Sequence, residues 1–195
     1  MKILLNFFLF LITLSISIIS PAVQSKCIPD QQLSLLHFKK NLVFNASLSS
    51  KLIFWNSSTD CCSWGGITCS SDGRVLGLDI SSESVSGGID NSNSLFHLPK
   101  LQSLNLADNW LGNGSQSIPS AIGELMNLRY LNLSLNVYSG QIPIEISRLT
   151  RLVVLDISYS GYKEPLKLES PNLHMLVQNL TELRELYLDG VQISA

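Results

Sequence analysis

The sequence has little of what most enzymes and nucleic-acid-binding proteins need. Only 14% of its 195 residues are charged, and the formal net charge is −2 at pH 7, which provides no electrostatic basis for binding nucleic acid. The three histidines, His37, His97 and His174, stand far apart. There is no glycine-rich phosphate loop, no Gly-x-Ser-x-Gly motif and no carboxylate pair at useful spacing. The sequence therefore predicts a protein that is not an enzyme and takes no cofactor.

Long apolar runs are also absent after the first residues of the chain. The stretch from Ile3 to Ile19 is mostly apolar and follows Lys2, while Val23 and Ser25 match a cleavage site before residue 26. This pattern is typical of a secretory signal peptide over residues 1–25. An uncleaved membrane anchor is the alternative, but polar residues interrupt the run, which is short for a membrane span. We therefore expect entry into the secretory pathway.

Cysteine is scarce and confined to one segment, at Cys27, Cys61, Cys62 and Cys69. Behind a signal peptide, an even count in a compact segment predicts disulfides. Four cysteines allow three pairings. Adjacent cysteines rarely bond to each other, which disfavours Cys61–Cys62. Of the other two pairings, spacing only weakly favours Cys27–Cys61 with Cys62–Cys69. A zinc site is the rival interpretation. Because paired Cys-x₂-Cys spacing is missing, we expect no metal.

Residues 26–73 differ from the rest of the chain. Pro29 and Asp30 predict the start of a helix, with Asp30 as its N-cap. Apolar residues follow at helical spacing: Leu35, Phe38 and Leu42. We expect this helix to cover the first coil of the array that follows, because an open solenoid end needs a cap. Trp55 and Trp64 flank the cysteines and are expected to pack on them.

A repeating unit occupies residues 74–195 and starts at residues 75, 101, 128, 152 and 183. Its apolar positions 1, 4, 6 and 11 are Val75, Leu78, Ile80 and Val85; Leu101, Leu104, Leu106 and Leu111; Leu128, Leu131, Leu133 and Tyr138; Leu152, Leu155, Ile157 and Tyr162; and Leu183, Leu186, Leu188 and Ile193. This is the leucine-rich repeat pattern, in which a short strand leads into a loop and a return segment. It predicts a right-handed α/β solenoid of about five coils with an N-terminal disulfide cap.

The return half of each unit repeats as well. Apolar residues stand three and six places before each new unit: Leu98 and Leu95, Leu125 and Ile122, Leu149 and Ile146, Leu180 and Val177. This spacing predicts short helical or 3₁₀ turns on the back of the coil. The array has no polar cap after the fifth repeat, so its end would be apolar and favour association.

Position 9 of the unit differs between repeats. Asn109 and Asn136 can bond backbone groups in the turn that have no ladder partner. Glu83, Ser160 and Val191 replace the asparagine in the other repeats. We therefore expect those coils to be looser at this turn.

Five Asn-x-Ser/Thr sequons predict a secreted glycoprotein. They are Asn45, Asn56, Asn113, Asn132 and Asn179. Asn132 stands between two inward leucines, so its side chain is expected to face outward, where a glycan would cover part of the strand surface.

Outward positions of neighbouring strands should form one continuous concave surface. These positions are Ser103, Asn105 and Asp108; Tyr130, Asn132 and Leu135; Val154, Asp156 and Tyr159; and Glu185, Tyr187 and Gly190. The best candidates for binding anchors are Tyr130, Tyr159 and Tyr187, because tyrosine offers a large area and a polar tip. The alternative is that this part of the array is mainly a scaffold and recognition lies elsewhere.

Several motifs resemble those of one family. The stretch from Asp60 to Cys69, with Cys27 and the helix between them, resembles the plant-type cap of leucine-rich repeat receptors. Ser139-Gly-Gln-Ile-Pro143 is similar to the plant repeat consensus, and residues 166–195 resemble the N-terminal part of Verticillium wilt resistance-type receptor-like proteins. The resemblance implies the disulfides Cys27–Cys61 and Cys62–Cys69. It also implies the ectodomain of a plant immune receptor that recognises an extracellular protein or peptide of microbial origin, with a co-receptor kinase as a further partner.

Such receptors carry many more repeats, a membrane span and a short cytoplasmic tail. We therefore expect this chain to be a fragment, a truncated gene model or a secreted short form. Membrane contact would come only through a missing C-terminal span, so the product is expected at the plasma membrane or in the apoplast. The alternative function is a secreted inhibitor of microbial wall-degrading enzymes, similar to polygalacturonase inhibitors, for which about ten repeats and a closing cap would be typical.

Overall fold

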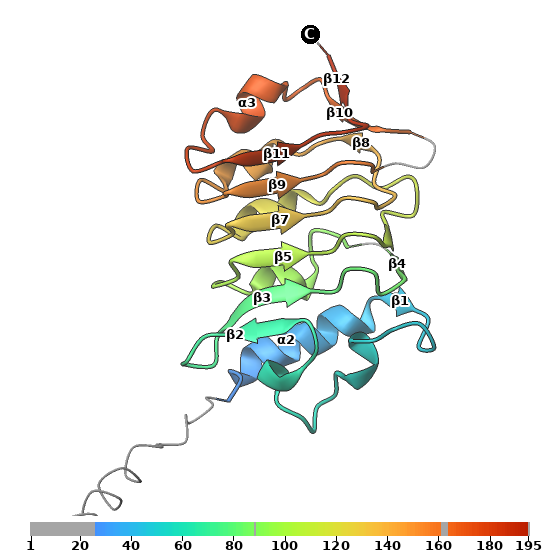
Figure 1. The fold of residues 1–195 in the computed structure, drawn as a ribbon, viewed down its shortest axis with the longest axis vertical. Helices are drawn as coiled ribbons and strands as arrows, with labels where there is room; N and C mark the ends of the chain where they lie inside the picture. The colour runs from blue at the N-terminus through green and yellow to red at the C-terminus, as the bar shows by residue number, and fades with distance from the viewer. Residues whose placement is uncertain (1–25, 88, 161–163, 195) are drawn as a thin grey trace, which may run out of the picture.

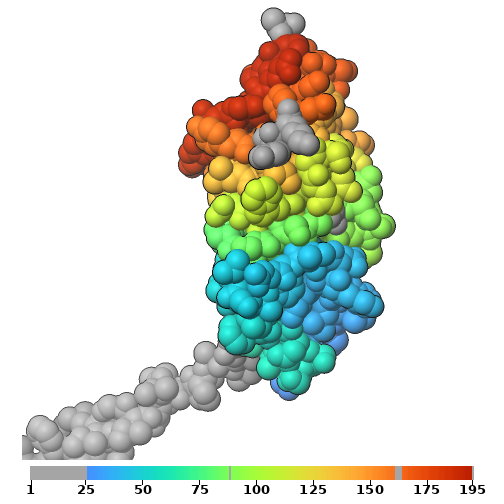
Figure 2. All heavy atoms as spheres, turned by 90° about the vertical axis from the view of Figure 1, so that its right-hand side faces the viewer, coloured from blue at the N-terminus to red at the C-terminus, as the bar shows by residue number. Residues whose placement is uncertain are grey.

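The computed structural model describes residues 26–87, 89–160 and 164–194 and shows coils stacked in chain order upon an N-terminal cap (Figure 1). In the space-filling view the coils form successive layers, each next to its neighbours in sequence (Figure 2). The predicted leucine-rich repeat solenoid is confirmed. The predicted signal peptide, residues 1–25, and Tyr162 lie outside the described residues.

A six-stranded sheet forms one side of the solenoid. Its strands, in spatial order, are β2 (Ile67–Cys69), β3 (Val75–Asp79), β5 (Ser103–Asn105), β7 (Tyr130–Asn132), β9 (Val154–Asp156) and β11 (Glu185–Tyr187). All neighbours run parallel except β2, which belongs to the cap and pairs antiparallel with β3. One in-register row contains Leu78, Leu104, Leu131, Leu155 and Leu186. The inward leucines therefore stack directly, so each coil completes the core of its neighbours.

Two small sheets run beside the main one, and the repeat pattern did not predict them. The first contains β1 (Val43–Phe44), β4 (Val85–Gly87) and β6 (Trp110–Leu111); the second contains β8 (Gly140–Gln141), β10 (Leu166–Leu168) and β12 (Gln192–Ile193). Leu166 and Leu168 are fully buried. Leu166 pairs with Gly140 of the preceding coil, so extra residues in the fourth repeat move this strand beyond its place in the repeat pattern.

The back of the solenoid is built from short helical turns, as the spacing predicted. They are the 3₁₀ helices η3 (Ser94–His97), η4 (Ser120–Glu124) and η5 (Ile144–Arg148), and the α-helix α3 (Leu173–Val177). Leu98, Leu125 and Leu149 are the C-cap residues of the 3₁₀ turns, Leu180 follows α3, and all four are buried. A single helical turn lets the chain reverse within one coil while it still buries two apolar side chains.

Gly123 in η4 allows the next coil to pack closely. A Cβ at Gly123 would lie 2.6 Å from the carbonyl oxygen of Glu145, whereas a Cβ at Gly65 would lie no closer than 3.5 Å to Lys51. Gly123→Ala is therefore expected to lower the free energy of unfolding by about 1–3 kcal/mol. Gly65→Ala, the matched control, should change it little. Urea unfolding of both variants checks this, and equal stabilities would contradict it.

The cap contains α2 (Pro29–Lys40), η1 (Leu52–Phe54) and η2 (Cys61–Ser63). The predicted N-cap is wrong: Ile28 occupies that position, and Asp30 lies in the first helical turn. Pro29 takes the first helical position, where its fixed φ and missing N–H are tolerated. The side-chain cap appears instead at η2, where Asp60 accepts a hydrogen bond from the Cys62 N–H.

The cap covers the first coil with a tightly packed apolar layer. Leu35 and Phe38 of α2 are fully buried. The rings of Trp55 and Trp64 stack at 5.2 Å between centroids, and both side chains are buried. The fifth repeat is less covered: Leu183, Leu186 and Leu188 are only partly buried, and Ile193 is 47% exposed. Association through that end stays a prediction.

Candidate ligand-binding surface

The structure brings the predicted outward strand residues together in two rows. One row contains Ser103, Tyr130, Val154 and Glu185, and the other contains Asn105, Asn132, Asp156 and Tyr187. Adjacent strands lie about 4.8 Å apart, so these side chains form one surface. The cap extends the first row, because Gly77 of β3 pairs with Ser103 and with Thr68 of β2. Beside Gly77 lies a hollow of about 400 Å³.

A row of exposed residues follows the strands. Its residues occupy position 8 of each repeat and have left-handed backbones: Ser82, Asp108, Leu135, Tyr159 and Gly190. Tyr159 is 62% exposed and Leu135 is 52% exposed. Large side chains rarely adopt this conformation. Leu135 and Tyr159 adopt it and are nevertheless exposed, so neither side chain contributes to the core. Tyr187 on β11 is also exposed.

The polar residues at the strand ends have a structural role that the repeat pattern did not predict. Asn132 and Asp156 each accept, through Oδ1, the backbone N–H two residues later, at 2.9 and 3.0 Å. The Ser134 and Ser158 hydroxyls donate to the same oxygens. Asn105 makes the corresponding backbone bond. These Asx turns end the strands, and the Asn/Asp-x-Ser spacing was the signal that could have revealed them.

The buried asparagines at position 9 join successive coils. Asn136 Nδ2 donates to the carbonyl oxygens of Leu106, Leu133 and Ser134, and its Oδ1 accepts from the Leu111 N–H. Asn109 makes the same kind of contacts one coil earlier. A side chain with both a donor and an acceptor is needed here, because each turn has unpaired N–H and C=O groups.

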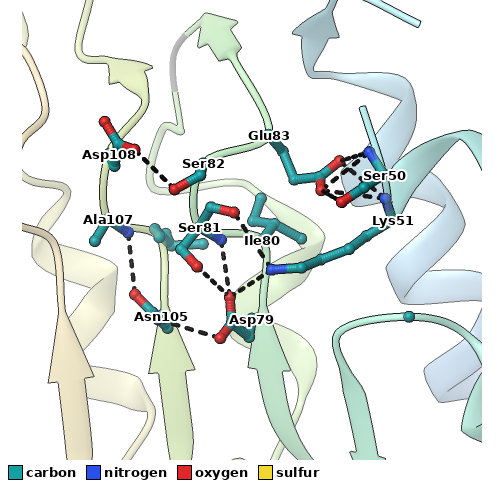
Figure 3. Close-up of polar contacts among 12 residues, drawn as sticks. Ser50, Lys51, Asp79, Ile80, Ser81, Ser82, Glu83, Asn105, Ala107 and Asp108 are labelled. Atoms are coloured by element: carbon teal, nitrogen blue, oxygen red, sulfur yellow. Dashed lines mark hydrogen bonds and ion pairs between the residues drawn. The ribbon is translucent and has the colours of Figure 1, made fainter. Parts of the chain in front are cut away.

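Glu83 occupies this position in the first coil and faces the cap instead of another repeat (Figure 3). Its carboxylate accepts hydrogen bonds from the hydroxyls of Ser49, at 2.5 Å, and Ser50, at 2.7 Å. The backbone N–H groups of Ser50, Lys51 and Leu52 also donate to it. Glu83 is fully buried, so the expectation of a looser coil here is wrong. A carboxylate only accepts, and this cap segment presents only donors.

Glu83 cannot donate to the carbonyl groups of its own turn, as Asn109 and Asn136 do. Lys51 of the cap supplies that donor instead. Its Nζ lies 2.9 Å from Asp79 Oδ1 and 3.3 Å from the Ser81 carbonyl oxygen. Burial alone would raise the pKa of Asp79, but hydrogen bonds from Ser81 and Lys51 hold that pKa below its ordinary value. Asp79 is therefore charged and paired, and Asn105 Nδ2 donates to its other oxygen.

The predicted disulfides are confirmed as Cys27–Cys61 and Cys62–Cys69. All four sulfurs are bonded in pairs, so none is available as a thiolate ligand. Among the sequons, Asn45, Asn56, Asn113 and Asn179 are exposed. Asn132 is half-buried, and its Nδ2 donates to the Tyr130 hydroxyl at 3.1 Å. A glycan on Asn132 would replace that bond at the centre of the concave surface.

In the ranges that the structure describes, no helix is long and apolar enough to cross a membrane.

Comparison with known proteins agrees with this architecture. Residues 28–70 match the family model of the leucine rich repeat N-terminal domain, and residues 100–125 and 127–149 match that of the leucine rich repeat. The crystal structure of the BIR3–SERK2 complex from Arabidopsis thaliana contains a chain with 32% identity and a TM-score of 0.66. The match covers 85% of this chain and 84% of that one. Fold and cap thus define a leucine-rich repeat solenoid of the plant type.

The sequence relatives identify a more specific family than the fold alone does. Receptor-like protein 7 of Arabidopsis thaliana is 41% identical over 96% of this chain, and Receptor-like protein 6 is 37% identical over 88%. The chain belongs to the plant leucine-rich repeat receptor-like proteins. It spans about a fifth of the length of these relatives, with 19% of each covered.

Proposed function

We propose that this chain is the N-terminal part of the extracellular, ligand-recognising region of a plant cell-surface immune receptor and that it has no catalytic activity. The observation that carries the proposal is the concave sheet, whose outward residues form two in-register rows across successive coils. The inward leucines and the buried asparagines hold the coils together, so a surface of this kind can differ in outward residues while the fold stays the same.

The exposed side chains on this face support a binding role. Tyr159 and Tyr187 are 62% and 44% exposed, and Tyr130 is half-buried between them and the cap-proximal strands. Tyrosine is enriched at protein interfaces because one rigid side chain contributes both apolar area and a hydrogen-bonding group. The proposed ligand is an extracellular protein or peptide of microbial origin.

The family relationship supports the remaining parts of the proposal. Receptor-like proteins 6 and 7 are much longer than this chain, so further repeats and a membrane span would follow it in the complete receptor. The related structure is itself a complex between BIR3 and SERK2. A co-receptor kinase is therefore the proposed second partner, and the proposed location is the outer face of the plasma membrane, or the apoplast for a short form.

Replacing Tyr130, Tyr159 and Tyr187 together by alanine in the full-length receptor tests the proposal. We expect the dose of an activating microbial culture filtrate needed for a half-maximal response to rise at least about tenfold, since buried anchors dominate binding energy. Secretion and surface level should stay normal, because none of the three tyrosines is fully buried.

The matched control replaces three exposed apolar residues on or beside the back turns, Met126, Ile144 and Met175. These substitutions should leave the response unchanged. A normal response of the triple tyrosine variant, at a normal surface level, would place recognition outside these residues and contradict the proposal.

A further inference from the structure

The outward positions of the strands and strand ends have a one-sided charge. Acidic residues occupy Asp79, Asp108, Asp156, Glu185 and Asp189. In each of the five repeats the structure describes the positions equivalent to residues 77, 79, 81 and 82. None of the residues at these positions is lysine or arginine. Lys51 of the cap neutralises Asp79. Arg129 and Arg184 stand just before β7 and β11, and Arg129 pairs with Glu182. The outward positions themselves stay acidic towards the later strands.

Four side chains from three neighbouring strands come together there, and we name them the acidic-aromatic cluster: Tyr130, Asp156, Glu185 and Tyr187. Tyr187 is in register with Asp156, and its hydroxyl donates to Glu185 Oε2 at 3.0 Å. The Glu185 carboxylate raises the pKa of Tyr187, first through this hydrogen bond, and Asp156 and Tyr130 add smaller effects. Tyr187 therefore lies within electrostatic reach of the other three groups.

The carboxylates of the cluster are not neutralised within the described chain. No ion pair involves Asp156 or Glu185 in the described ranges, where the ion pairs are Lys51–Asp79, Arg74–Asp72 and Arg129–Glu182. The Asp156 bonds to Ser158 use only Oδ1. Glu185 and Tyr187 are exposed, so an approaching ligand can reach both a carboxylate and an aromatic ring.

We infer that the acidic-aromatic cluster binds a cationic side chain, arginine above lysine, of a peptide segment lying across β7, β9 and β11. This inference rests on the proposed function and specifies the chemistry of its ligand. A guanidinium is planar, so it can bond a carboxylate with two donors while it stacks on a tyrosine face. An anionic or purely apolar segment would leave both carboxylates without compensation.

The decisive variant combines Asp156→Asn and Glu185→Gln. Asparagine stands at the same register position in the two preceding strands, as Asn105 and Asn132, where it makes the same Asx turn. Glutamine at 185 keeps an acceptor for Tyr187. The double variant therefore removes charge without removing the turn, so a folding defect is not expected. Asp156→Asn would form an Asn-x-Ser sequon with Ile157 and Ser158, so the wild-type chain and all variants are exported to a bacterial periplasm, which forms disulfides and adds no N-linked glycan there.

The probe is a short capped glycine–serine peptide with two arginines, titrated against the full secreted chain by fluorescence anisotropy. A matched peptide with two citrullines has nearly the same shape without charge. We expect the arginine peptide to bind about three- to tenfold more tightly, a range set by exposed charge pairs and cation–π contacts. The double variant should lose this preference. Raising ionic strength from about 0.05 M to about 0.3 M should also weaken it.

The control variant, Glu124→Gln with Glu169→Gln, removes the same charge from exposed positions outside the concave strands and should keep the preference. Equal binding of both peptides to the wild-type chain, or an unchanged preference in the double variant, would overturn the inference. If that happens while the tyrosine variant still loses its filtrate response, the proposed function stands and the ligand chemistry is different. If the wild-type chain prefers the arginine peptide while the triple tyrosine variant still responds normally to the filtrate, the inference about the cluster stands and the proposed function is wrong.

Discussion

Replacing Cys27 and Cys61 together by alanine is expected to lower the free energy of unfolding by about 4 kcal/mol. The bond closes a segment with a sequence separation of 34 residues, and a cross-link over a long segment restricts the unfolded chain strongly. The same bond fixes the start of α2 to η2, so its loss also loosens the layer that covers the first coil. For a chain of this length, the melting temperature should fall by about 8–16 °C.

The second disulfide provides the comparison for that prediction. Cys62–Cys69 closes a segment with a separation of only 7 residues, so its replacement by alanines should cost about 2 kcal/mol. Urea and thermal unfolding of the two double variants, each expressed through the secretory pathway, measure the difference. An equal or larger loss for the Cys62–Cys69 variant would contradict the loop-length argument.

Glu83→Ala is expected to lower the free energy of unfolding by about 3 kcal/mol, because it leaves several donors of the cap segment without an acceptor. The hydroxyls of Ser49 and Ser50 and the N–H groups of Lys51 and Leu52 all face the vacated space. The expected consequence is separation of the cap from the first coil. Unfolding followed through the stacked tryptophans of the cap would detect it.

The pH dependence of stability gives an independent test of the same residue. Burial alone would raise the pKa of Glu83, but the hydrogen bonds from Ser49, Ser50, Lys51 and Leu52 outweigh it, so the pKa is lowered in the folded chain. A lowered pKa means that the contribution is present above about pH 4.3, the ordinary value, and is lost as pH falls through the folded-state pKa.

Glu83→Gln is the matched control for this titration. Glutamine retains one acceptor oxygen but cannot ionise, so the variant should be less stable than the wild type near neutral pH. The difference between the two should shrink as the pH falls below about 4. A difference that stays constant over this range would show that the charge of Glu83 does not hold the cap.

The sequence by itself determined the repeated parts of this protein. The leucine positions and the back turns follow from local spacing, because each coil needs the same inward residues to complete the core of its neighbour. All apolar positions of the first three repeats proved buried. The even number of cysteines in the cap, behind a predicted signal peptide, was sufficient to predict that they form disulfides.

The tertiary structure decided what joins different parts of the chain. The donors around Glu83 lie more than thirty residues earlier, and no local pattern reveals that a cap segment ends in unpaired N–H groups. Leu166 and Leu168 are buried because strand pairing, not repeat position, places β10 between β8 and β12.

The concave surface shows the same division. Alternation along the strands predicted which side chains face outward, but not that Asn132 and Asp156 would also close the turns after their strands. The repeat frame put Asp156 and Tyr187 at the same outward position, but it could not show the hydrogen bond from the Tyr187 hydroxyl to Glu185, which depends on how the side chains lie in the folded chain. Outward residues carry no packing signal, so their neighbours become known only when the coils are stacked.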